Sequence, residues 1–199
     1  MEYGARIINI FLHPLIYVPL AYLSYVLIQD TWYNEYLYQY YIPVLSLGFF
    51  VPLLAQVYSK WRVRKMQSVL IKNLMQVVVE IIYIYLLFQL FKYLSTEYFK
   101  PFKLYILAYI SSRISLNLLN IIKRKPAIKT MGMCSLITFL IGLSLYYKQN
   151  ILWIIAFLII LLGLLVSFKL SNRRYNALDI LIAILLGVSS QIYVMSYYL

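Results

Sequence analysis

The chain has 199 residues, of which 64% are hydrophobic and only 12% are charged, and its formal net charge is +12. A helix that crosses a membrane needs about 20 apolar residues, so spans of this length use most of the chain and exclude a separate soluble domain. Because a spanning segment must satisfy its backbone hydrogen bonds internally, we predict one all-α, polytopic membrane helix bundle over residues 1–199.

Seven apolar segments follow one another along the chain and are predicted to be the membrane spans. In none of them do the apolar residues keep to one stripe, which is typical of helices surrounded by lipid. The second segment is the shortest. The predicted spans are 7–28, 42–58, 69–92, 102–121, 131–147, 151–170 and 177–198.

The basic residues are distributed unevenly between the two sides of these spans. Twelve of them lie before span one or between spans two and three, four and five, and six and seven, whereas only Lys92, Lys100, Lys103 and Lys148 lie on the other side. The positive-inside rule then predicts a cytoplasmic N-terminus and a C-terminus outside the cytoplasm. The basic clusters either set this topology alone or also hold anionic lipid headgroups. Charge spread over helix ends argues against a nucleic-acid partner.

The reactive side chains are few. One histidine, His13, and one cysteine, Cys134, cannot form the common zinc or haem sites. The six glycines are scattered and form no phosphate-binding loop. We therefore predict no metal and no cofactor. The 22 tyrosines crowd the span ends, where Tyr rings prefer the headgroup level.

Two charged residues, Glu80 and Arg113, fall in the middle of spans three and four. Each belongs to a polar row at helical spacing. An ionised group at this depth costs about 2.5–3.5 kcal/mol, so we predict a buried ion pair between two antiparallel helices. The pair either fixes the register of the helices or lines a polar route for an ion or a lipid headgroup. The rows are Lys72, Gln76, Glu80 and Tyr83, and Tyr105, Tyr109, Arg113, Asn117 and Asn120.

Residues 167–187 resemble the last motif of the type 2 phosphatidic acid phosphatase superfamily. That motif reads Ser-Arg, five residues, His, three residues, Asp, and often a Gly eight positions later. Here Lys169 stands at the Arg position, Tyr175 at the His position, Asp179 at the Asp position and Gly187 at the Gly position.

The other motifs of this superfamily are matched more loosely. The middle motif, Ser-Gly-His, would fall at residues 125–133, with Lys129 at the place of the His, and the first motif is reduced to a basic segment from Lys60 to Lys65 without Arg-Pro. His13-Pro14-Leu15 is similar to a sequence in an extra N-terminal helix of a bacterial branch. The resemblance implies a lipid-phosphatase-like core, an extra N-terminal helix and a location in the bacterial inner membrane.

The resemblance also implies a site that binds phosphate but lacks the catalytic histidines. Phosphoester hydrolysis in this superfamily needs two histidines, and neither is present at its motif position, so we predict no catalytic residue. Asp179 is expected to cap its helix or to pair with Lys169 or Arg174. The residues expected to bind a lipid phosphate are Lys125, Lys129, Lys169, Arg173, Arg174, Tyr175 and Asp179.

Three functions remain open at this point. The first is a catalytically silent relative that acts as an accessory subunit of an inner-membrane complex or binds a phosphate-bearing lipid. Its partners would be membrane lipids and another integral membrane protein. The second is an active lipid phosphatase with non-standard groups. The third is a lipid-phosphate carrier in which Glu80 and Arg113 line the route.

Overall fold

The computed structural model describes residues 16–28, 42–51, 53–54, 57, 69–94, 99–121, 127–171 and 175–196. For residues 69–77 and 120–121 it describes the backbone alone. Over these ranges the chain is helical and contains no strand. The elements are α2 (Tyr17–Ile28), the π-helical turn η1 (Ser46–Phe50), α5 (Val69–Tyr93), α6 (Lys100–Ile121), α7 (Ile128–Tyr147), α8 (Leu152–Ser171) and α9 (Ala177–Ser196).

Three of these helices, α7, α8 and α9, have the length and apolar composition of membrane spans. Each has 20 residues, which corresponds to about 30 Å of helix, the thickness of the hydrocarbon core. The chain is therefore a helical membrane protein. For α5 to α9 the predicted segments agree with the helix ends to within three residues. The count of seven spans stays a prediction.

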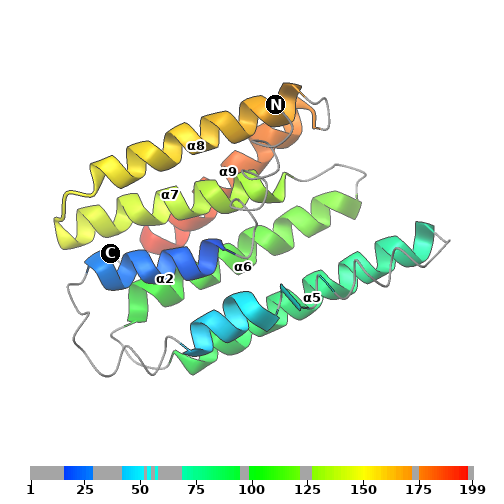
Figure 1. Cartoon of the computed structure of the whole chain (residues 1–199), viewed down its shortest axis with the longest axis horizontal. Helices are drawn as coiled ribbons and strands as arrows, with labels where there is room; N and C mark the ends of the chain where they lie inside the picture. The colour runs from blue at the N-terminus through cyan, green and yellow to red at the C-terminus, as the bar shows by residue number, and fades with distance from the viewer. Residues whose placement is uncertain are drawn as a thin grey trace.

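The helices form an elongated bundle in which α9 packs against α6 and α7, and α7 also contacts α2 and α8 (Figure 1). Lys169 near the end of α8 meets Thr130 near the start of α7, so these two helices are antiparallel. Leu104 near the start of α6 packs with Val194 near the end of α9. The starts of α7 and α9 and the ends of α6 and α8 therefore share one end of the bundle, at the right in Figure 1.

The close approach of α9 to α7 depends on Gly187. A Cβ atom at this position would lie 2.5 Å from the carbonyl oxygen of Met131 and 3.1 Å from the Cβ of Cys134. Small residues allow the backbones of membrane helices to approach in this way. Gly187, taken from the sequence as a motif position, is thus a packing residue of the α7–α9 contact.

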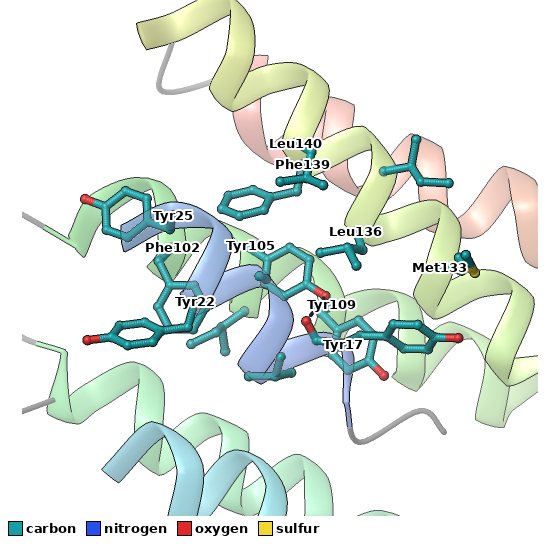
Figure 2. Packing of buried hydrophobic residues seen from close by; sticks show 14 of the residues in the cluster. Tyr17, Tyr22, Tyr25, Phe102, Tyr105, Tyr109, Met133, Leu136, Phe139 and Leu140 are labelled. Atoms are coloured by element: carbon teal, nitrogen blue, oxygen red, sulfur yellow. Dashed lines mark hydrogen bonds between the residues drawn. The ribbon is translucent and has the colours of Figure 1, made fainter. Parts of the chain in front are cut away.

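A cluster of aromatic side chains fills the interface between α2, α6 and α7 (Figure 2). The Tyr22 and Phe102 rings meet edge-on with centroids 5.1 Å apart, and the Tyr105 and Phe139 rings lie 4.7 Å apart. The Tyr17 hydroxyl donates to the carbonyl of Lys129 at 3.0 Å. A buried hydroxyl needs such an acceptor, so these tyrosines belong to the core. Not all the tyrosines of the chain are anchors at the membrane surface.

Gln191 on α9 joins three helices. Its side-chain amide donates to Ser135 Oγ on α7 at 2.6 Å and to the carbonyl of Tyr105 on α6 at 3.3 Å. Gln191 is completely buried, and polar side chains between membrane helices form hydrogen bonds of this kind. This contact ties α9 to both neighbours in the half of the bundle away from the basic ends.

Candidate functional site

Four of the predicted site residues lie at the shared end of α7, α8 and α9. Lys129 is in the first turn of α7, Lys169 is in the last turn of α8, Tyr175 is in the connection that follows, and Asp179 is in the first turn of α9. The short connection from α8 to α9 keeps the last three of these on adjacent helix ends. The other predicted residues, Lys125, Arg173 and Arg174, lie outside the described residues.

Lys169 is the centre of this group. The residue is 9% exposed, and its Nζ donates to Thr130 Oγ1 at 2.8 Å. The same Nζ lies 4.9 Å from the centroid of the Tyr175 ring, a cation–π contact. An ammonium has three N–H donors, and Thr130 is its one hydrogen-bond acceptor in the part of the chain that the structure describes. Both contacts of the Lys169 charge are therefore with neutral groups.

Asp179 lies beside this site but does not neutralise Lys169. The residue is 7% exposed in the first turn of α9, where an acidic side chain is favoured by the helix dipole. Lys169 donates to Thr130 instead, and no described carboxylate lies within ion-pair distance of its Nζ. Of the three alternatives expected for Asp179, which were a helix cap, a pair with Lys169 and a pair with Arg174, the pair with Lys169 is not present. The alternative pairing with Arg174 involves a residue outside the described ranges.

The described members of the site include two cations, Lys129 and Lys169, and none of them is a histidine, the residue that the resembled motifs use for phosphoryl transfer. Such a transfer needs an activated nucleophile and an acid for the leaving group. Lys129 and Tyr175 occupy the positions at which the resemblance would place the reactive histidines, and neither is an imidazole. The described residues also contain no group of three His, Cys, Asp or Glu side chains suited to a metal ion.

A second polar cluster joins α5 and α6. Arg113 Nη2 donates to Glu80 Oε2, so the ion pair predicted from the two polar rows is present. The Arg113 guanidinium carbon lies 5.1 Å from the Tyr83 ring centroid and 5.9 Å from that of Tyr109. Arg113 is 1% exposed, whereas the side chain of Glu80 is 21% exposed. The structure does not describe the side chains of Lys72, Gln76 and Asn120, which are further members of the two polar rows.

Two polar contacts in the structure were not predicted from the sequence: the hydrogen bond of Lys169 to Thr130, and the hydrogen bonds of Gln191 to α6 and α7. Thr130 has no local signal beyond its place after Lys129, because the lysine that it binds is 39 positions away. Gln191 is one polar residue in an apolar helix, a pattern that indicates a polar contact but not its partner. In both cases the helix was predicted, and the neighbouring helix that supplies the partner was not.

Comparison with protein-family models, with curated proteins and with solved structures gives no match for this chain. The class that the structure supports is a helical membrane protein in which Lys129 and Lys169 lie at one end of the three helices long and apolar enough to cross a membrane. The resemblance to lipid phosphatases stays an expectation that depends on motif positions.

Proposed function

We propose that this protein is a non-enzymatic membrane protein that binds the phosphate headgroup of a lipid at the shared end of α7, α8 and α9. Under the predicted orientation this end lies at the cytoplasmic face of the bacterial inner membrane. The observation that carries the proposal is the nearly buried ammonium of Lys169, whose contacts, Thr130 and Tyr175, are both neutral. Removing a charge from water is costly unless an opposite charge is supplied. A lipid phosphate would supply it.

The surrounding charges support this choice of ligand. Lys129 lies next to Thr130, while Asp179 is the one acidic residue in the described part of the site. Lys125, Arg173 and Arg174 are close in sequence and add to the positive charge. A phosphate oxygen bound by Lys169 would form a charge-assisted hydrogen bond, worth about 1.5–3 kcal/mol. The site therefore favours an anionic headgroup over a zwitterionic one.

The experiment is a titration of the detergent-solubilised protein with dihexanoyl phosphatidic acid, which presents the headgroup with very short chains. Lys169→Gln is expected to weaken binding about tenfold, since one charge-assisted hydrogen bond is lost. Lys92→Gln is the matched control. Lys92 also places its Nζ over an aromatic ring, 5.1 Å from the Phe88 centroid, but at the opposite end of the bundle. Its loss should leave binding unchanged.

Two results would contradict this proposal. One is equal affinity of the Lys169→Gln variant and the parent protein for the phosphatidic acid. The other is equal binding of dihexanoyl phosphatidylcholine, whose headgroup has no net charge. Release of inorganic phosphate by the purified protein would favour the enzymatic alternative instead.

The Glu80–Arg113 pair is proposed to serve the fold and not a transport route. The two charges are matched and hydrogen-bonded to one another, so they carry no net charge with which to attract a lipid phosphate. Arg113 is buried while Glu80 is partly exposed, and the best-known role of an ion pair between packed helices is to fix their arrangement. Membrane lipids are accordingly the partners that we propose, and a partner protein stays an expectation from the sequence.

A further inference from the structure

An apolar groove with a volume of about 510 Å³ runs along α7, α8 and α9. On α7 its wall extends from Cys134 to Leu145, about 16 Å at the helical rise of 1.5 Å per residue. Its lining includes Cys134, Gly142 and Leu145 on α7, Ile159 and Leu162 on α8, and Ile192 on α9.

The groove points toward the Lys169 site. Thr130 precedes Cys134 by four residues on α7, and Lys169 follows Leu162 by seven residues on α8. Residues at these spacings share one face of a helix. The contact between Lys169 and Thr130 therefore lies on the same faces as the groove, about 6 Å beyond its last lining residue on α7.

We propose that this groove holds one acyl chain of the lipid whose phosphate binds Lys169. The inference rests on the proposed function and specifies the ligand as a phosphate-bearing lipid with a long hydrocarbon chain. The glycerol ester that separates a phosphate from its chains would span the distance of about 6 Å along α7 between Thr130, which accepts from Lys169, and Cys134. The three walls belong to the helices of membrane-spanning composition, so the open side faces lipid hydrocarbon.

Neighbouring isoleucines on α8 allow a matched test. Ile159 lines the groove and is 51% exposed, while Ile160 is 62% exposed and does not line it. The affinities of dihexanoyl and dipalmitoyl phosphatidic acid are measured for each variant in one detergent by native mass spectrometry. Ile159→Gln should weaken dipalmitoyl binding about tenfold, because an amide without a hydrogen-bond partner replaces an apolar wall. Dihexanoyl binding should not change, and Ile160→Gln should change neither affinity.

Filling the groove provides a second test that does not depend on polarity. Gly142 lines the groove on α7, so Gly142→Phe should place a ring in the path of the chain and lower dipalmitoyl affinity selectively. Gly163→Phe is the control. A Cβ atom at Gly163 on α8 meets no atom within 4 Å, so this phenylalanine should project into lipid without effect on binding.

The outcomes separate this inference from the proposed function. If both groove variants bind dipalmitoyl phosphatidic acid like the parent protein while Lys169→Gln still weakens the dihexanoyl lipid, the acyl-chain inference fails alone. If Lys169→Gln affects neither lipid, the proposed function fails, and this inference fails with it. A third outcome is that the parent protein is an oligomer and that Ile159→Gln converts it to monomers without changing its lipid affinity. This result would show that a second copy of the protein occupies the groove, and it would also overturn the inference.

Discussion

Arg113 on α6 donates through Nη2 to Oε2 of Glu80 on α5, and this ion pair joins two helices that the sequence places next to one another. The guanidinium also lies against the rings of Tyr83 and Tyr109. The Arg113 charge is therefore stabilised by one ion pair and by two cation–π contacts. Charge of this kind inside a bundle is stable only while its partner is present. The first prediction follows from this dependence.

Glu80→Gln should lower the stability of the protein by about 3–5 kcal/mol, because it leaves the Arg113 charge buried without its acid. The double exchange Glu80→Arg with Arg113→Glu should recover part of this loss. Thermal unfolding in detergent provides the measurement. Lys103→Gln on α6, whose ammonium lies over the Phe91 ring, is the control and should cost less than about 1 kcal/mol.

The charge exchange is the decisive variant of this series. If the exchanged protein is as unstable as either single variant, the pair does not act as a unit, and the two side chains must be stabilised by separate neighbours.

Gly187→Ala and Gly163→Ala should change stability in opposite directions. At Gly187 the new methyl group would meet the carbonyl oxygen of Met131 at 2.5 Å, so α9 must move away from α7 at a cost of about 1–3 kcal/mol. At Gly163 the methyl group meets nothing within 4 Å, and replacing a helical glycine by alanine stabilises by about 0.5–1 kcal/mol. Unfolding of the two variants under identical conditions measures both signs. A destabilised Gly163→Ala protein would mean that another surface packs on α8.

Gln191→Leu should destabilise the bundle by about 1–3 kcal/mol, since the hydroxyl of Ser135 loses a buried hydrogen-bond partner. Ser190→Ala is a suitable control because, among the described residues, the Ser190 hydroxyl bonds to the carbonyl of Gly187 in its own helix, at 3.4 Å, and to no other helix. Denaturant unfolding in detergent compares the two. Equal stability of both variants would contradict a role for Gln191 in joining α6, α7 and α9.

The predicted orientation can be tested at the two ends of α8. Asn150 and Asn176 are exposed and lie at opposite ends of this helix. In intact cells an impermeant maleimide should label Asn150→Cys and not Asn176→Cys, since the basic end is expected to face the cytoplasm. The one native cysteine, Cys134, is buried, so background labelling should be low. The reverse pattern of labelling would invert the topology.

Helix extents were predictable because they depend on local properties of the chain. The segments predicted at 151–170 and 177–198 correspond to α8 and α9 with shifts of one or two residues, as expected when length and apolarity decide where a span begins and ends. The Glu80–Arg113 contact was predictable for a related reason. Two opposite charges at similar depth on consecutive helices have few other partners.

The candidate site was predictable only in part. Motif spacing placed Lys169, Tyr175 and Asp179 together, and the cation–π contact between Lys169 and Tyr175 links two of them. The same spacing allowed an ion pair of Lys169 with Asp179, which the structure does not contain. The hydroxyl of Thr130 takes that place because α7 lies against the end of α8. No pattern along one helix contains this information.

The sequence alone determined that the protein is helical, where most of its helices begin and end, and which ends are basic. These properties follow from backbone hydrogen bonds that close within a few residues and from charges carried on the connections. Only the tertiary structure decided which helices touch, and with them the Thr130 contact of Lys169, the three-helix junction at Gln191 and the apolar groove. The two hydrogen-bonded contacts join residues between 39 and 86 positions apart. All three features depend on how side chains of different helices pack against one another.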